Sequence, residues 1–213
     1  MSSNLGRVIA TEGDPIAQGA GWVPLADVAR VESGHTPSRK HPEWWGGKVP
    51  WIALPDIRRL DGQTATETIE YINELGLANS SARILPVGTV CLSRTASVGF
   101  ITVMGIPMAT SQDFVNWVPG DRLRSWYLAT GLIAAREYLR NLAEGAIHKT
   151  IYMPTLKGLR IKLPSLDEQD RALSRLREVK ATLTEAQQAL TKQAKALEAL
   201  APALFNAALD GTL

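Results

Sequence analysis

Cysteine and long hydrophobic runs are scarce in this sequence. Cys91 is the one cysteine among 213 residues, so the chain forms no internal disulfide, which suits a reducing compartment. No apolar run approaches the roughly 20 residues that a helix needs to cross a bilayer. The first 13 residues lack the charged and then apolar layout of a signal peptide. We therefore expect a cytoplasmic protein without a membrane partner.

Sequence signatures of catalysis are also missing. The chain has no Asn/Asp-Pro-Pro-aromatic motif of amino-methyltransferases, no glycine-rich dinucleotide fingerprint and no Gly-x-x-x-x-Gly-Lys-Ser/Thr loop for a nucleotide. His35, His41 and His148 lack metal-ligand spacing with Cys91 or with acidic residues. These absences predict a chain with no catalytic residue, no metal site and no cofactor.

Charge gives only a weak indication of the partner. The net charge is +2, from 23 basic and 21 acidic residues, and the basic excess is confined to the first 164 residues. A mild excess of this kind permits contact with nucleic acid but does not require it. Motifs, rather than composition, have to indicate the function.

Proline, glycine and tryptophan divide the chain into two regions. Residues 1–164 contain 11 of the 12 prolines and all six tryptophans, whereas residues 165–209 contain one proline and no glycine. Short apolar stretches alternate with turn signals in the first region, which predicts an α+β (mixed α/β) domain over residues 21–164 after a loosely ordered segment 1–20. Strands are expected at 49–53, 89–92, 100–103, 114–118 and 159–163, and a helix at 123–141.

The second region, residues 165–213, is predicted to be one long coiled-coil helix. Ser165 and Glu168 have the spacing of a capping box, which marks a helix start. A heptad pattern follows over six repeats, with leucine at five of the six a positions, as is typical of a coiled coil. The pattern predicts a dimerisation or spacer arm; the alternative is a helix that folds back on its own domain. The residues expected at a dimer seam are Leu176, Val179, Leu183, Ala186, Leu190, Leu197, Leu200 and Leu204.

Two residues interrupt the heptad pattern. Gln193 places an amide at a d position, which weakens an apolar seam. Pro202 lacks the backbone N–H of other residues, and its ring clashes with the carbonyl of Glu198 one turn back. We therefore expect the long helix to kink or break at Pro202, with a short terminal helix over residues 203–209.

Several short motifs follow one another in a defined order. They are Trp22 to Val28, Gly34-His35-Thr36-Pro37-Ser38, Glu43 to Ile52, Ser80 to Val90, Ser111-Gln112, and the run from Ile161 through Pro164-Ser165-Leu166-Asp167-Glu168-Gln169. No single motif is diagnostic. The ordered set, from about Trp22 to the C-terminus, resembles the target recognition domain and spacer helix of Type I restriction-modification DNA specificity subunits.

The resemblance implies a function and partners. Family members usually carry two recognition domains and two spacer helices, whereas each element occurs once here and no internal repeat is found, so the chain looks like half a subunit. The resemblance implies recognition of double-stranded DNA, with modification (methyltransferase) subunits and a restriction (endonuclease) subunit as catalytic partners. A homodimer with antiparallel helices would place two identical domains on a bipartite site with inverted half-sites.

Reading DNA requires basic and amide side chains on loops, some at phosphates and some at base edges. Arg94 has a side chain suited to guanine edges, and Gln112 one suited to adenine edges. For any single residue, a solvated surface side chain is the alternative. The predicted contact residues are His35, Thr36, Ser38, Arg39, Lys40, Lys48, Arg58, Arg59, Ser93, Arg94, Thr95, Ser111, Gln112, His148 and Lys149.

Two other functions remain open. A coiled-coil interaction protein without DNA binding, such as an inactive fragment that modulates the full complex, predicts weak and salt-insensitive association with DNA. Genuine phosphate contacts weaken steeply as salt rises, which distinguishes the two. Within the family, a recombination cassette that donates its domain to a full-length gene has the same sequence features as a working half-subunit.

Overall fold

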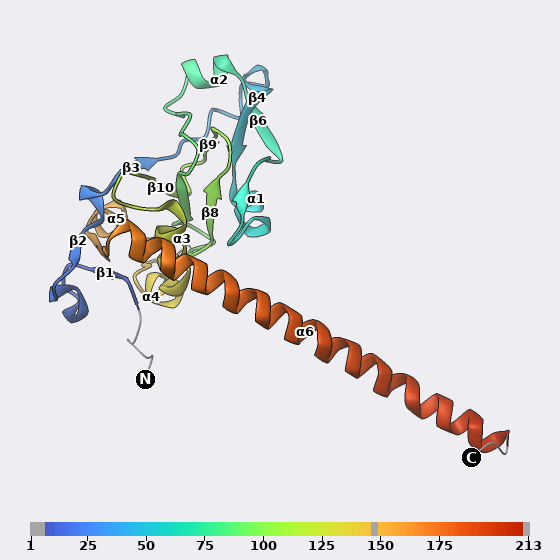
Figure 1. Ribbon diagram of the computed structural model, residues 1–213. Coiled ribbons are helices and arrows are strands. Elements are labelled where there is room, and N and C mark those ends of the chain that lie inside the picture. The colour runs from blue at the N-terminus through green and yellow to red at the C-terminus, as the bar shows by residue number, and fades with distance from the viewer. Residues whose placement is uncertain (1–6, 146–148, 211–213) are drawn as a thin grey trace. The chain divides into compact units, whose positions relative to one another are not determined.

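The computed structural model describes residues 7–145 and 149–210 (Figure 1). The chain divides into two compact units, one ending at Asp170 and the other beginning at Arg171. The sequence places the boundary slightly earlier, between 164 and 165, where the capping box marks the start of the long helix. The first helical turn belongs to the first unit because it forms hydrogen bonds with the preceding domain.

Short strands dominate the first unit, and helices lie between them. The strands are β1 (Ile9–Thr11), β2 (Trp22–Pro24), β3 (Ala29–Ser33), β4 (Trp45–Ile52), β5 (Thr64–Ala65), β6 (Glu70–Ile72), β7 (Val90–Ser93), β8 (Ile101–Met104), β9 (Ala109–Thr110), β10 (Phe114–Pro119) and β11 (Leu159–Lys162). The helices are α1 (Leu54–Arg59), α2 (Glu74–Ala78), α3 (Ser125–Ala134), α4 (Arg136–Asn141), α5 (Met153–Lys157) and α6 (Leu166–Leu209), with 3-10 turns η1 (Pro15–Gln18), η2 (Leu25–Asp27) and η3 (Pro42–Trp44).

The described strands assemble into three sheets (Figure 1). The central sheet has the order β3-β10-β7-β8-β5, in which β10 is antiparallel to both β3 and β7, and β5 is parallel to β8. A second sheet has the antiparallel order β1-β11-β2, and a third has the order β6-β4-β9. The mixed α/β fold followed by a long helix is the fold class that the sequence predicts.

The central sheet is covered on both faces. Val90 and Leu92 of β7 pack in one hydrophobic cluster with Leu128 of α3, while Cys91 packs in another with Ile57 of α1. Successive side chains of a strand point to opposite faces, so a sheet buried on both faces has nearly continuous apolar strands. Burial raises the pKa of the Cys91 thiol, which therefore stays protonated at neutral pH.

The longer predicted elements are confirmed, with small shifts in their ends. The predicted strands correspond to β4, β7, β8, β10 and β11. The predicted helix 123–141 is two helices, α3 and α4, because Ala135 between them leaves the helical conformation with φ −89° and ψ 9°.

The prediction of a loosely ordered segment over residues 1–20 is wrong for the part that the structure describes. Strand β1 pairs with β11 through the register Ile9↔Ile161, and Ile9 is fully buried. Asp14 then caps η1 by accepting a hydrogen bond from the Ile16 N–H (3.1 Å), and it pairs with Arg7. A three-residue strand is too short to show a period in sequence, and the free edge of β11 is what orders it.

Helix α6 is continuous from Leu166 to Leu209, so the predicted break at Pro202 is not observed. Proline in a helix interior costs about 3 kcal/mol, because one hydrogen bond is lost and the ring crowds the preceding turn. Residues on both sides of Pro202 are mostly alanine and leucine, which favour the helix most, and the helix continues through it.

The capping box is confirmed: the Ser165 N–H donates to Glu168 Oε2 (2.9 Å) and the Glu168 N–H donates to Ser165 Oγ (3.4 Å). Within the described residues, none of the helices combines the length and apolar character that a membrane span requires.

Gln169 fastens the first turn of α6 to the domain. Its side chain is fully buried; Oε1 accepts from the Arg124 N–H (2.9 Å), and Nε2 donates to the carbonyls of Arg122 (2.9 Å) and Pro164 (3.0 Å). Beside it, Arg124 and Asp170 form a bidentate ion pair, and the hydrogen bonds to Asp170 raise the pKa of Arg124. The heptad pattern places Gln169 at an a position, but its side-chain amide forms hydrogen bonds with the domain.

Replacing Gln169 with alanine is expected to destabilise the first unit. The change leaves the Arg124 N–H and the Arg122 carbonyl without their partner and opens a cavity, which together should lower the free energy of unfolding by roughly 2–4 kcal/mol. Denaturant unfolding followed by circular dichroism measures the effect. Gln188→Ala, on the exposed surface of the same helix, is the matched control and should change stability by less than about 0.5 kcal/mol. Equal effects of the two substitutions would show that the buried amide does not anchor the helix.

Candidate nucleic-acid interface

The topology of the central sheet brings three loops to one end. Strands β3 and β7 both run antiparallel to β10, so the loops that follow β3 and β7 leave the sheet where the loop before β10 enters it. A fourth segment joins them, because the Ile151 N–H donates to the Arg94 carbonyl (2.9 Å) and the Ala96 N–H to the Lys149 carbonyl (3.2 Å). We call residues 34–36, 94–97, 111–113 and 149–151 the loop cluster.

Hydrogen bonds hold the loop cluster together across long stretches of sequence. The His35 N–H donates to the Thr110 carbonyl (2.9 Å), and the Thr36 hydroxyl donates to Gln112 Oε1. From the other side, Arg94 Nη2 donates to the Gln112 carbonyl (3.1 Å). Gln112 therefore lies between the loop after β3 and the loop after β7.

The loop after β7 is a tight turn with backbone strain. Ala96 has φ 59°, which is the left-handed region that residues other than glycine rarely adopt, and the Ser97 N–H donates to the Thr95 carbonyl (2.6 Å). The hydroxyl of Ser93 holds the base of this turn, because it donates to the Ser97 carbonyl and accepts from the Phe100 N–H (3.1 Å). Strain of this kind is concentrated at functional loops, where the surrounding structure maintains it.

Besides Ser111, six of the sequence-predicted contact residues are brought together in the loop cluster. They are His35, Thr36, Arg94, Thr95, Gln112 and Lys149. Gln112 and Lys149 are exposed, and the other four are half-buried. His148, the remaining predicted residue of the fourth segment, lies outside the described residues.

Ser93 and Ser111 do not present their hydroxyls to the surface. Both are buried, and the Ser111 hydroxyl donates to Asp113 Oδ2 (2.9 Å) and accepts from the Asp113 N–H (3.2 Å). Both side chains therefore shape the turns that carry Arg94 and Gln112, and we do not propose them as DNA contacts. A serine at the end of a strand is equally common as a turn former, so the sequence does not distinguish the two roles.

The arginines of α1 take different positions. Arg58 Nε donates to the hydroxyl of Ser97 (3.0 Å), which puts this guanidinium beside the loop cluster. Arg59 instead forms ion pairs with Glu67 (3.2 Å) and Asp56 (3.5 Å), so these carboxylates offset its charge. Ser97 is a site residue absent from the predicted contacts, and its place in a short polar loop between two strands is the sequence signal that indicates it.

Arg39 belongs to an aromatic cluster with an acidic partner. Its guanidinium lies 3.7 Å from the ring centroid of Trp45 and 5.3 Å from that of Trp51, and Nη2 donates to Glu70 Oε2 (2.7 Å). The bidentate hydrogen bonds from Arg39 lower the pKa of Glu70, which keeps that carboxylate ionised and offsets the arginine charge. Arg39 therefore has an acidic partner within the domain, and its role as a DNA contact stays a prediction.

The three other predicted residues of this region, Ser38, Lys40 and Lys48, are exposed. The carbonyl of Ser38 accepts from Trp45 Nε1 (3.5 Å), and Trp51 Nε1 donates to the carbonyl of His35 (3.1 Å). These two indole hydrogen bonds tie the loop after β3 to the aromatic cluster along its length. Lys40 lies on this loop, and Lys48 lies on β4, which supplies both tryptophans.

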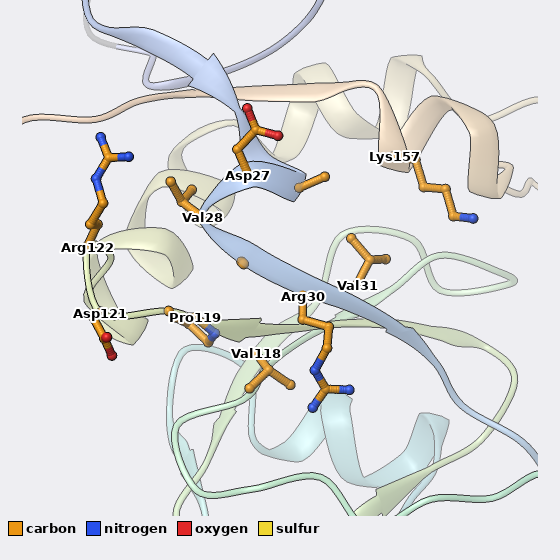
Figure 2. A pocket seen from close by; sticks show the side chains of 12 residues that line it. Asp27, Val28, Arg30, Val31, Val118, Pro119, Asp121, Arg122 and Lys157 are labelled. Carbon is orange, nitrogen blue, oxygen red and sulfur yellow. The ribbon is translucent and has the colours of Figure 1, made fainter.

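A groove of about 690 Å³ lies at the other end of the same strands, where β3 begins and β10 ends (Figure 2). Figure 2 shows Asp27, Asp121, Arg30 and Lys157 around an apolar floor that includes Val118. Arg122 also lines the groove, and the two carboxylates offset most of the positive charge of its three basic side chains, so it offers little positive potential for a phosphate backbone. The loop cluster is the better candidate for a nucleic-acid interface.

A mixed α/β domain with basic and amide side chains on converging loops, followed by a heptad helix, has the layout expected of a nucleic-acid recognition module. Residues 20–196 match the family model described as the Type I restriction modification DNA specificity domain. The chain belongs to this family, in agreement with the resemblance of its short motifs.

Two curated relatives share this region. The chain is 32% identical over 149 residues to the Type I restriction enzyme MjaIX specificity subunit of Methanocaldococcus jannaschii, a match that covers 69% of this chain and 34% of the relative. It is 29% identical over 129 residues to the HindI specificity subunit of Haemophilus influenzae, covering 59% of this chain and 28% of the relative. The chain thus spans about a third of the length of the curated relatives that it matches.

Solved structures share the fold. The HsdS subunit from Thermoanaerobacter tengcongensis superposes with a TM-score of 0.64 at 20% identity, over 85% of this chain and 42% of that one. A chain from a structural study of complex assembly in the type I R-M system gives a TM-score of 0.65, also at 20% identity, over 85% of this chain and 44% of that one. At this identity the likeness establishes the architecture alone.

The strain at Ala96 predicts opposite effects of two substitutions. Ala96→Val places a β-branched side chain in the left-handed region and is expected to lower the free energy of unfolding by about 1–3 kcal/mol. Ala96→Gly relieves the strain, and its greater freedom in the unfolded state offsets part of that gain, so stability should stay equal to or above that of the wild type. Thermal unfolding of the three proteins measures both effects. A valine variant as stable as the glycine variant would contradict the strained turn.

Proposed function

We propose that this chain is a sequence-specific DNA recognition subunit of a Type I restriction-modification system that acts as a half-subunit. The observation that carries the proposal is the loop cluster, in which Arg94, Gln112 and Lys149 come together from three loops far apart in the sequence. Basic and amide side chains on rigid loops are what reading phosphates and base edges requires. The curated relatives are named specificity subunits of Type I restriction enzymes, which supports the proposal.

Within the loop cluster we assign two kinds of contact. Lys149 and Arg58 carry exposed charges suited to phosphates, and Lys40 on the loop after β3 and Lys48 on β4 are further exposed basic residues. Gln112 and Arg94 lie between the loops, where side chains with fixed geometry suit base edges in the major groove. Residues 21–164 are the proposed target recognition domain.

We propose that the chain has no catalytic role and uses no cofactor. Methylation and cleavage of DNA then belong to partner subunits, namely the modification (methyltransferase) subunits and the restriction (endonuclease) subunit. The support is the naming of the curated relatives, which are the specificity subunits of their restriction enzymes.

The second part of the proposal is a homodimer through residues 165–213. Leu183, Leu190 and Leu197 are 62%, 65% and 69% exposed in the single chain, and they share one face of α6 at seven-residue spacing. A contiguous apolar stripe of this length is costly in water and is typical of a helix that packs against another helix. Two antiparallel copies would carry two identical recognition domains and read a bipartite site with inverted half-sites.

A coiled-coil interaction protein without DNA binding is the second candidate. Two observations favour it: Arg39 and Arg59, both expected to contact DNA, have acidic partners in the domain. Such a protein would associate with the full complex through α6 and modulate it. The two functions differ in how DNA binding responds to salt.

DNA binding by the full chain is expected to fall steeply as salt rises. Each phosphate contact contributes a slope of about −0.9 to a plot of log Kobs against log salt, so Arg58→Ala and Lys149→Ala should each reduce the slope by about 1. Fluorescence anisotropy with a labelled duplex between about 50 and 200 mM salt measures the slope. Lys157→Ala, in the groove at the other end of the sheet, is the control and should leave the slope unchanged. Weak binding that does not respond to salt would favour the second candidate.

The heptad seam predicts the effect of a charge at its centre. Leu190→Asp buries a carboxylate between two helices, so the variant should be a monomer of 23.1 kDa, while the wild type has twice this mass. Light scattering at several concentrations gives the mass. Gln188→Asp, which adds the same charge off the seam, should remain dimeric. A Leu190→Asp variant that stays dimeric would rule out this seam.

A further inference from the structure

Gln112 is exposed at the centre of the loop cluster, yet its conformation is held from two sides. The Thr36 hydroxyl donates to Oε1 of its side chain, and Arg94 Nη2 donates to its backbone carbonyl (3.1 Å). Neither contact buries the residue, so packing does not explain them. The two bonds fix both the backbone and the side-chain amide of one solvent-facing glutamine.

The bond from Thr36 determines which end of the amide faces outward. A glutamine amide has an oxygen that accepts and an NH2 group that donates, and a freely rotating amide exchanges the two ends. With Oε1 turned to the Thr36 hydroxyl, Nε2 is directed away from it, and within the described residues Nε2 has no hydrogen-bond partner. The surface therefore presents two N–H donors at a defined position.

The backbone that precedes Thr36 is held in place. The adjacent His35 is bonded through its N–H to the Thr110 carbonyl (2.9 Å) and through its carbonyl to Trp51 Nε1 (3.1 Å). Gly34 approaches the strand so closely that a Cβ built there would lie 1.9 Å from the Ser111 carbonyl oxygen, so the loop fits only with glycine at this position. Thr36 therefore acts as a fixed donor.

We propose that Thr36 is a positioning residue for base recognition, which locks Gln112 as a donor toward the acceptor edge of one base pair in the major groove. The inference rests on the proposed function and adds a determinant of specificity to it. The acceptors available in the major groove are O6 and N7 of guanine, N7 of adenine and O4 of thymine. Thr36 acts through Gln112 and does not itself contact the base.

The test is selection of bound sequences from a random duplex library by the full chain, with the preference at each base pair as the readout. Thr36→Ser keeps the hydroxyl, and Thr36→Val keeps the shape without it. A good base contact gives a preference of about 5- to 150-fold. Wild type and Thr36→Ser should share one preference at a single base pair, and Thr36→Val should lose about fivefold or more there while the other positions and the salt slope stay the same.

A double-mutant cycle separates positioning from direct contact. In a Gln112→Ala chain that base-pair preference should already be lost, and adding Thr36→Val should change nothing further. Preference retained by Thr36→Val or by Gln112→Ala, or an additional loss in the double variant, would overturn the inference. Gln112→Ala alters an exposed side chain, so it keeps the test decisive even if Thr36→Val unfolds. A wild-type chain that selects no sequence at any salt would instead overturn the proposed function itself.

Discussion

The antiparallel pairing of β10 with both β3 and β7 is the constraint on which the candidate site depends. Because β10 lies between the two, the loops that follow β3 and β7 and the loop that precedes β10 must emerge at the same end of the sheet. The pairing itself is stabilised by burial of β10 on both faces, with Phe114 in one hydrophobic cluster and Val115 and Trp117 in the other. A core of this kind fixes the positions of the loops, and the loops carry the chemistry.

The buried strands of the core and the long helix can be predicted from the sequence, whereas the shortest strands cannot. The strands that form the buried sheet, such as β7 and β10, have apolar runs long enough to be recognised, and α6 has both a capping box and a heptad repeat. Strands such as β1 and β9 have two or three residues and are ordered by a partner strand that the sequence does not identify. The rule that an interior proline breaks a helix does not hold at Pro202, because the residues around it favour the helix more than one proline disfavours it.

The sequence predicts which types of residue lie at the candidate site, but it does not predict which other residues each of them contacts. The loops that carry Arg94, Gln112 and Lys149 are identifiable as polar segments between strands, and the structure brings them together. Arg39 has the same sequence character, but Glu70 and two tryptophans surround it, and these partners are distant in the chain. Ser93 has a hydroxyl that faces inward. Burial and ion pairing are tertiary properties, so sequence alone does not separate contact residues from residues that build the loops.

Two features of the chain support the proposed homodimer. The described domain carries a loop cluster, and α6 carries exposed leucines at seven-residue spacing. Gln169 connects them locally, since it uses an early heptad position to bond the first turn of α6 to the domain. In the proposed dimer, the length of the helix would set the spacing between the two half-sites.

Hydrogen–deuterium exchange of the full chain with and without duplex DNA shows whether the loop cluster reads DNA. Binding through the loop cluster predicts slower exchange on DNA addition at residues 34–36, 94–97, 111–113 and 149–151, with no change along the groove at the opposite end of the sheet. Protection confined to that groove, or no protection of the loop cluster at salt concentrations where DNA is bound, would contradict it.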